Sequence, residues 1–318
     1  MAALAAVILL ISSGCASSQT ATGKKHTIAL VTKSTTSAFW HSVKAGAGAA
    51  AAEYNLDFTF EGPEKEEDYE TQNRMIREAV ERGAEALVIS AVDYNANAEA
   101  VDQAAKKGLQ IVVIDSDVNS SGVVSRIGTN NDAAGEMAAR ALLDGEEEVL
   151  HVGIVNYDVN SANGQQREEG FRRVIQESPR VADITTINVI STTEDARIGT
   201  EKLLKEHPEI NAIVTFNEWT SLGVGWAIRG QGLADATRVV AFDSNVVNVG
   251  MHTAVRQQTE NVQGGTKPLA LVDRAHQSRI LEEIAVLDGL GDAGQLLIYN
   301  AACTHVQMAY LRVTHLSV

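Results

Sequence analysis

Polar side chains recur directly after several apolar runs of this chain. The residues that follow the runs 111–114, 212–215 and 238–242 are Asp115 with Ser116 and Asp117, then Asn217, and then Asp243. In open α/β sheets, ligands bind outside the carboxyl ends of the strands. If the three runs are strands, these groups face a common ligand. The alternative for each residue taken alone is an ordinary surface position.

Arg167 and a pair of aromatic residues extend this set. Arg167 follows the apolar run 149–155, and Phe39 and Trp40 follow the run 27–31. A carboxylate accepts two hydroxyl protons, an amide both donates and accepts, and a guanidinium donates a fork of hydrogen bonds. Aromatic faces cover the apolar face of a sugar ring. The combination predicts a site for vicinal hydroxyls, while packing in the core is the alternative for the aromatic pair.

Other kinds of chemistry lack their motifs in this sequence. The segment 32–38 after the first run holds hydroxyls but no glycine, which excludes a dinucleotide fingerprint and a P-loop at that position. The segment 116–122 does not supply the spaced oxygens of a calcium loop. The eight histidines show no paired metal-binding spacing, and no nucleophile stands in a triad spacing. We therefore expect no metal, no cofactor and no catalytic residues.

Length and charge set the broad class. A chain of 318 residues predicts about two domains, and 45% hydrophobic with 21% charged residues is typical of a globular protein. The formal net charge of −15 argues against nucleic acid as a partner, because the bulk surface repels phosphates. Two cysteines make neither a disulfide scaffold nor a four-cysteine zinc site.

Short apolar runs alternate with amphipathic segments from His26 onward. Runs without alternation that are separated by helices indicate parallel sheets covered on both faces. This predicts an α/β protein, and about ten strands suggest two sheets. We expect the chain to cross between the sheets near 128–130 and to return after Asp243. The predicted strands are 27–31, 56–60, 86–90, 111–114, 125–127, 149–155, 185–190, 212–215 and 238–242, and the predicted helices are 39–54, 69–82, 95–107, 132–143, 167–177 and 221–229.

The amino terminus predicts export. Residues 2–11 form an apolar run that is too short to span a bilayer but suits the hydrophobic region of a signal peptide. Cys15 follows Ser-Ser-Gly, which resembles a bacterial lipobox, and residues 16–23 are typical of a tether. We expect residues 1–24 to be a lipoprotein signal and tether, with Cys15 lipidated. The alternative is a buried helix with an incidental cysteine.

Several segments in the correct order carry a family resemblance. They are HTIALVTKSTTSAFWHSVKAGA, IVVIDSDV, RIGTNNDAAGEMAA, QQREEGF, HPEINAIVTFNEWTSLGVGWAI and VVAFDSN. Over about 26–243 the chain resembles the periplasmic sugar-binding proteins of the ribose-binding type, which feed ABC importers. The resemblance implies a type I periplasmic binding protein fold, with two Rossmann-like lobes, parallel sheets and a hinge of several crossings. It places 25–128 plus about 259–290 in the N-terminal lobe, and 129–258 plus about 291–318 in the C-terminal lobe.

The resemblance also assigns roles to residues. Phe39 and Trp40 fall where the family stacks aromatic rings on the sugar. The family's polar sugar ligands match Asp115, Arg167, Asn217 and Asp243. Ser37 and Ser116 stand where ribose binders have asparagine and arginine, which argues against ribose itself. Asp117 is a possible extra contact, and Gln258, or its competitor Gln257, would supply the family's glutamine.

These expectations converge on a binding function. The resemblance implies an extracytoplasmic, membrane-anchored monomer that closes around a neutral pentose or hexose and delivers it to an ABC permease. Alternatives are a sugar-sensing receptor for a signalling partner and the effector domain of a LacI-type regulator. The regulator would need a helix-turn-helix ahead of the first strand, where this chain has about 25 apolar and Ser/Thr-rich residues. An enzyme would need a cofactor motif or an activated nucleophile.

Overall fold

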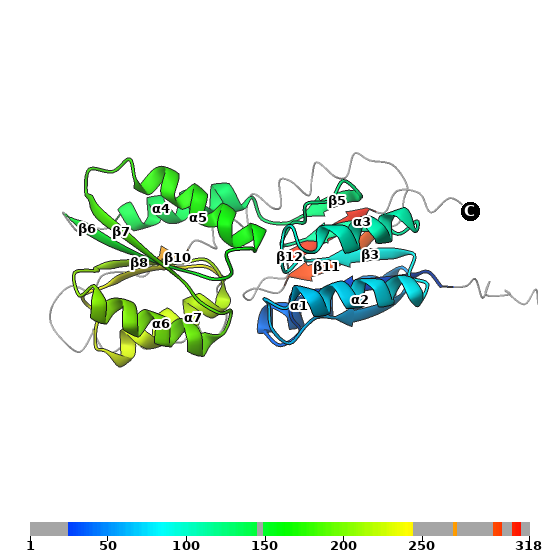
Figure 1. The fold of residues 1–318 in the computed structure, drawn as a ribbon, viewed down its shortest axis with the longest axis horizontal. Coiled ribbons are helices and arrows are strands. Elements are labelled where there is room, and N and C mark those ends of the chain that lie inside the picture. Colours follow the sequence, from blue (N-terminus) through cyan, green and yellow to red (C-terminus); the bar gives the residue numbers. More distant parts are fainter. Residues whose placement is uncertain (1–24, 145–148, 244–269, 272–294, 301–306, 313–318) are drawn as a thin grey trace, which may run out of the picture.

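The computed structural model describes residues 25–144 and 149–243, and the strands at 270–271, 295–300 and 307–312. Two five-stranded parallel sheets dominate these residues, and each sheet forms the centre of one lobe (Figure 1). The first lobe is built on the strands up to residue 127, and the second lobe contains the described residues of 131–243 together with the strand at 270–271. The two lobes lie side by side along the long axis of the molecule.

The first lobe has the strand order β2-β1-β3-β4-β5, and all of its strand pairs are parallel. Its helices α1, α2 and α3 connect the first four strands. The elements are β1 (Thr27–Val31), α1 (Ala38–Glu53), β2 (Asp57–Glu61), α2 (Tyr69–Glu81), β3 (Ala86–Ile89), α3 (Ala98–Lys106), β4 (Gln110–Ile114) and β5 (Val123–Ile127).

The second lobe has the strand order β10-β9-β8-β6-β7, again with parallel pairs. Its elements are α4 (Asn131–Leu143), β6 (Leu150–Asn156), α5 (Ala162–Ile175), β7 (Val181–Asn188), α6 (Thr193–Glu206), β8 (Ala212–Thr215), α7 (Glu218–Gly230), β9 (Arg238–Ala241) and β10 (Ala270–Leu271). The chain therefore passes from the first sheet to the second after β5.

Alternate residues of each strand enter different cores. In β1, Ile28 and Leu30 pack with Trp40 and Val43 of α1 on one face, while Ala29 and Val31 pack with residues of α2 and α3 on the other. The second sheet is likewise covered on both faces by two hydrophobic clusters. Burial on both faces explains why the strand sequences are apolar without alternation. The α/β class with two parallel-sheet lobes is thus confirmed.

Helices α4 and α5 of the second lobe cross at very short range. A Cβ atom on Gly135 would lie 2.0 Å from the backbone oxygen of Arg167, and one on Gly170 would lie 2.1 Å from that of Asp132. Only glycine fits at such a crossing. The contact matters for function because α5 carries Arg167, one of the predicted ligand residues.

Three segments differ from the sequence expectations. Helix α5 begins at Ala162, so Arg167 lies in its second turn and does not open the helix. The pair 270–271 belongs to the second sheet through β9, although the expected boundary put it in the N-terminal lobe. Two antiparallel strands, β11 (Gln295–Asn300) and β12 (Gln307–Arg312), form a hairpin whose first strand lies against α1, although this tail was expected in the C-terminal lobe. The lobe boundaries beyond residue 258 therefore differ from the prediction at these strands.

Candidate ligand-binding site

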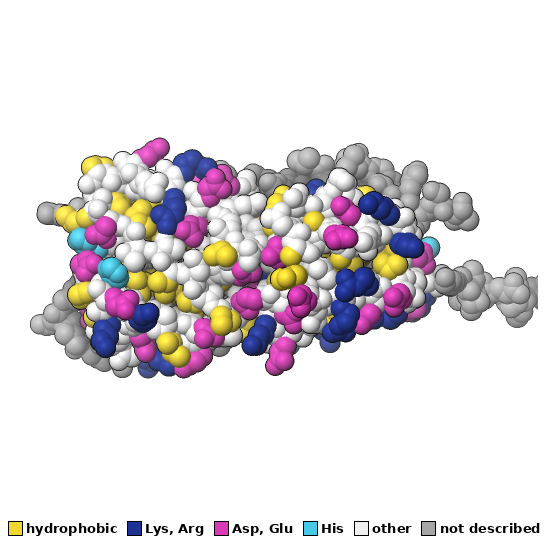
Figure 2. Space-filling model, in the orientation of Figure 1, with side chains coloured by type: hydrophobic (Ala, Val, Ile, Leu, Met, Phe, Trp, Pro, Cys, Tyr) yellow, Lys and Arg dark blue, Asp and Glu magenta, His cyan; other side chains and the backbone are white. Residues whose placement is uncertain are grey.

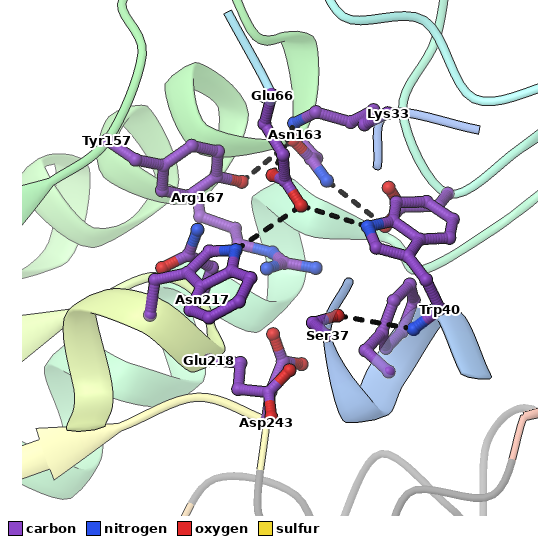
Figure 3. Close-up of a pocket in the computed structure, with 13 residues that line it drawn as sticks. Lys33, Ser37, Trp40, Glu66, Tyr157, Asn163, Arg167, Asn217, Glu218 and Asp243 are labelled. Atoms are coloured by element: carbon purple, nitrogen blue, oxygen red, sulfur yellow. Dashed lines mark hydrogen bonds and ion pairs between the residues drawn. The ribbon is translucent and has the colours of Figure 1, made fainter. Parts of the chain in front are cut away.

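A cavity of about 340 Å³, counting its space open to solvent, lies between the two lobes (Figure 3). Its lining consists of Lys33, Ser37, Phe39, Trp40, Glu66, Asp115, Tyr157, Asn163, Arg167, Asn217, Glu218, Trp219 and Asp243. Seven of the residues predicted from the sequence are in this set: Ser37, Phe39, Trp40, Asp115, Arg167, Asn217 and Asp243. The structure therefore brings together side chains that are more than two hundred residues apart in the sequence.

Asp115 contributes the carboxylate of the first lobe. It follows β4 in the left-handed backbone region, at φ 57°. Its Oδ2 accepts a hydrogen bond from Ser90 Oγ at 3.0 Å, and its Oδ1 accepts one from Asn163 Nδ2 of the second lobe at 3.1 Å. The Asn163 amide is held in that orientation because its own oxygen accepts from Tyr157 Oη and Ser161 Oγ, each at 2.7 Å. Asp115 is thus fixed by both lobes.

Arg167 is the guanidinium of the second lobe, and it is buried. Its Nε donates to Asn131 Oδ1 at 2.8 Å, its Nη1 donates to the Phe216 backbone oxygen at 2.5 Å, and its plane lies 4.9 Å from the centre of the Phe242 ring. Burial by itself lowers the pKa of Arg167, but nearby Tyr157, Asp243 and Asp115 outweigh the burial and raise it. The side chain is therefore a fixed, permanently charged donor.

Two strand ends of the second lobe provide an amide and a carboxylate. Asn217 follows β8 and caps α7, because its Oδ1 accepts from the Thr220 backbone N–H at 2.9 Å in a reciprocal capping box. The cap occupies the amide oxygen of Asn217, and the residue lines the cavity. Asp243 follows β9 and, like Asp115, has a left-handed backbone with φ 56°. Aspartate tolerates this conformation better than most residues do.

The beginning of α1 contributes the aromatic wall of the first lobe. Ser37 is the N-cap of α1, and its Oγ accepts from the Trp40 backbone N–H at 3.2 Å. Phe39 and Trp40 meet edge to face with ring centres 4.8 Å apart. Trp40 is almost fully buried and still lines the cavity, so packing in the core and a place beside a ligand are compatible for this residue.

Ser116 and Asp117 do not lie with the other predicted residues. The left-handed turn at Asp115 directs Ser116 into the interior, where it is fully buried and its backbone N–H donates to Ser90 Oγ. Asp117 pairs with Arg126 at 2.8 Å on the surface. Neither is part of the cavity lining, so only Asp115 of the three consecutive residues lies at the cavity. Gln258, its competitor Gln257 and Cys15 lie outside the described residues.

Six lining residues were not predicted: Lys33, Glu66, Tyr157, Asn163, Glu218 and Trp219. Tyr157, Glu218 and Lys33 could have been found by the signal that identified Asn217, because they lie within three residues of the ends of β6, β8 and β1. Glu66 had no such signal, and its partner is Lys33. Each is charged and almost fully buried, which is rare unless the charges are paired, and they pair with each other at 3.6 Å.

The charged groups of the lining are mainly acidic. Four carboxylates, those of Glu66, Asp115, Glu218 and Asp243, face two cations, Lys33 and Arg167. Burial raises the pKa of the Tyr157 hydroxyl far above its ordinary value, so this group is a neutral donor at physiological pH. Among the residues that the structure describes, no three His, Cys, Asp or Glu side chains gather as a metal site would require. The cavity is thus suited to hydrogen bonding of an uncharged polar ligand.

Comparison with known proteins identifies the family. The model of the periplasmic binding protein domain matches residues 28–259, which is more than half of the chain. The chain belongs to the periplasmic binding protein family. The sequence predicted a similarity to sugar-binding proteins of the ribose-binding type. The relatives of this periplasmic binding protein, described in the next paragraph, confirm that similarity.

Curated relatives carry sugar names. The D-ribose/D-allose-binding protein of Pseudomonas aeruginosa is 28% identical over 238 residues, covering 70% of this chain and 72% of that protein. A D-apiose import binding protein of Actinobacillus succinogenes is 27% identical over 222 residues, covering 69% of this chain and 70% of that protein.

Solved structures agree with the fold. A solute-binding protein of an Agrobacterium vitis ABC transporter, solved with bound D-fucose, has a TM-score of 0.69 and 27% identity, covering 72% of this chain and 80% of that one. A carbohydrate transporter solute-binding protein from Agrobacterium radiobacter, solved with D-arabinose, has a TM-score of 0.72 at 24% identity. It covers 90% of this chain and 94% of that one, and at this identity it bears on the fold alone.

Proposed function

We propose that this periplasmic binding protein captures a neutral monosaccharide in the cavity between its lobes and delivers it to an ABC importer. The observation that carries the proposal is the convergence of Asp115 from the first lobe with Arg167, Asn217 and Asp243 from the second around one cavity walled by aromatic rings. Carboxylate, amide and guanidinium groups are matched to vicinal hydroxyls, and the rings are matched to the apolar face of a pyranose or furanose. The sugar names of the relatives support the same ligand class.

The electrostatics of the lining favour an uncharged sugar. Phosphate or carboxylate groups on a sugar would approach a lining whose described residues include four carboxylates and two cations, Lys33 and Arg167. Repulsion at this range in a partly desolvated site opposes their binding. A neutral pentose or hexose meets no such barrier.

Closure of the lobes supplies the affinity and the signal to the permease. Desolvation strengthens the hydrogen bonds between sugar hydroxyls and the charged groups. A micromolar dissociation constant corresponds to about −8 kcal/mol, which a few charge-assisted hydrogen bonds together with stacking can supply. The closed form presents both lobes to a permease as one surface, which distinguishes it from the open form.

The family supports a receptor outside the cytoplasm, and the pattern of surface charge argues against a nucleic-acid partner. On the face seen in Figure 2, acidic and basic side chains are interspersed over both lobes, so this face has no continuous basic strip for a nucleic-acid backbone. We infer that the protein binds sugar without transforming it, acts as a monomer and is held at the membrane by a lipid on Cys15. Within the described residues, no helix has the length and apolar character needed to cross a bilayer.

A thermal-shift screen of the protein against pentoses, hexoses, polyols and sugar phosphates tests the proposal. We expect stabilisation by one or a few neutral sugars, confirmed by titration calorimetry, and none by the phosphates. Stabilisation by sugar phosphates alone, or by no sugar at all, contradicts the proposed function.

A further inference from the structure

Two neighbouring glutamates of the first lobe reach across to the second lobe. Glu66 Oε1 accepts hydrogen bonds from two indole nitrogens, Trp40 Nε1 of its own lobe at 2.9 Å and Trp219 Nε1 of the second lobe at 3.3 Å (Figure 3). Glu67 Oε1 accepts from the backbone N–H of Ser191, also in the second lobe, at 2.7 Å. The bonds from Trp219 and Ser191 span more than 120 residues of sequence and connect the lobes at two separate points.

A buried lysine adds a third point. The second carboxylate oxygen of Glu66 pairs with Lys33 Nζ at 3.6 Å, and Lys33 Nζ donates to Ser161 Oγ of the second lobe at 2.7 Å. Lys33 is 2% exposed and Glu66 is 7% exposed, so each charge depends on its partner. Separation of the lobes would leave this pair without its contacts to Ser161 and Trp219.

The segment that carries the two glutamates is anchored at both ends. A Cβ atom on Gly62 would lie 2.9 Å from the Thr32 backbone oxygen, so the chain passes directly against the end of β1 there. At the other end, Asp68 caps α2 by accepting from the Thr71 backbone N–H at 2.9 Å. That hydrogen bond lowers the pKa of Asp68, which therefore stays ionised as a cap. Anchoring presents both glutamates at a fixed position toward the second lobe.

We propose that Glu66 and Glu67 form an interlobe clasp that slows the release of bound sugar. The inference rests on the proposed function, since release of sugar is what the clasp controls. Hydrogen bonds between the lobes form only when the lobes are together, so they stabilise the closed state relative to the open one. Glu67 is not part of the cavity lining, so its effect on release does not pass through a lost ligand contact. It is a positioning residue for the closed state.

The rate of sugar release from Glu67→Ala tests the clasp. Stopped-flow tryptophan fluorescence measures this rate with the sugar that binds most tightly in the screen. We expect the dissociation rate constant to rise roughly three- to tenfold, because a half-exposed charge-assisted hydrogen bond contributes less than a buried one. The association rate constant should stay within about twofold, since mutations at one binding surface act mainly on dissociation. The matched control is Glu64→Ala, an exposed glutamate of the same segment, which should leave both rate constants unchanged.

A second pair of variants isolates the indole bond. Trp219→Phe and Trp40→Phe each remove one N–H donor from Glu66 and keep an aromatic ring, but only the bond from Trp219 crosses between the lobes. We expect faster release from Trp219→Phe than from Trp40→Phe. Equal release from the two variants, or unchanged release from both Trp219→Phe and Glu67→Ala, overturns the clasp and leaves the proposed function intact.

Hydrogen exchange of the Ser191 amide reports on the clasp without sugar. We expect this amide to exchange faster in Glu67→Ala than in the native protein, with Glu64→Ala behaving like the native protein. If the native protein binds no sugar, the proposed function fails while this measurement still decides whether the clasp forms. Identical exchange in all three proteins shows that the Glu67 bond to Ser191 does not protect the amide and overturns the inference.

Discussion

Replacement of Asp115 by asparagine removes one negative charge from the cavity with little change in shape. Asparagine adopts the left-handed backbone region about as readily as aspartate, so the φ of 57° at this position is kept without new strain. The contacts to Ser90 and Asn163 each need an acceptor, and the asparagine side chain offers one oxygen where Asp115 offers two. The variant should therefore fold with a small loss of stability.

The effect on binding should be much larger. A hydrogen bond to a charged group contributes about 1.5–3 kcal/mol, and about 1.4 kcal/mol changes a dissociation constant tenfold. We expect Asp115→Asn to weaken sugar binding by about tenfold to a hundredfold in titration calorimetry. Asp117→Asn is the control, because its carboxylate pairs with Arg126 on the surface and is not part of the cavity. Affinity of Asp115→Asn within twofold of native, or an equal loss in Asp117→Asn, refutes the site assignment.

Three further variants test the supporting structure. Gly135→Ala places a methyl 2.0 Å from the backbone oxygen of Arg167 and should lower the free energy of unfolding by about 1–3 kcal/mol in urea melts. The control Gly230→Ala has no atom within 4 Å of the new methyl and should not lower it, so equal melts of the two variants contradict the close helix crossing. Asn217→Asp keeps an oxygen that caps α7, so it should leave stability nearly unchanged. Because the variant loses the N–H donor, it should weaken sugar binding about tenfold in calorimetry, and native affinity would remove this residue from the site. Asp68→Ala should lower the free energy of unfolding by about 1 kcal/mol in urea melts at pH 7. Because the pKa of Asp68 is lowered from 3.8 in the folded state, the difference between native protein and variant should shrink as the pH falls below 3.8. A difference that grows in acid contradicts the cap.

Strand ends were the most predictable feature of the fold and the site. The strands 27–31 and 212–215 have the limits expected from their apolar runs, and the groups that follow β4, β8 and β9 reach the cavity. The reason is geometric, since all parallel strands of a sheet end at the same edge. Arg167 was also found, although its helix begins five residues earlier than its sequence pattern indicated.

The parts of the fold and of the site that the sequence did not predict depend on contacts between distant segments. Glu66 lies in the acidic stretch 61–70, whose composition is typical of a solvated surface, and it becomes buried only because Lys33 and two indoles lie opposite it. The family resemblance placed Ser116 in the site, where ribose binders have an arginine, but it follows a left-handed residue and its side chain is buried in the core. The strand pairing of 270–271 and the hairpin β11–β12 likewise rest on partners that no local pattern indicates.

A crystal structure of the protein with the sugar that stabilises it most is the most direct test of the account. We expect the ring between the two lobes, against the Trp40 wall, with hydroxyls within hydrogen-bond distance of Asp115, Arg167 and Asn217. A sugar bound on an outer face of either lobe, or bound in the cavity without contact to any of these three side chains, would contradict it.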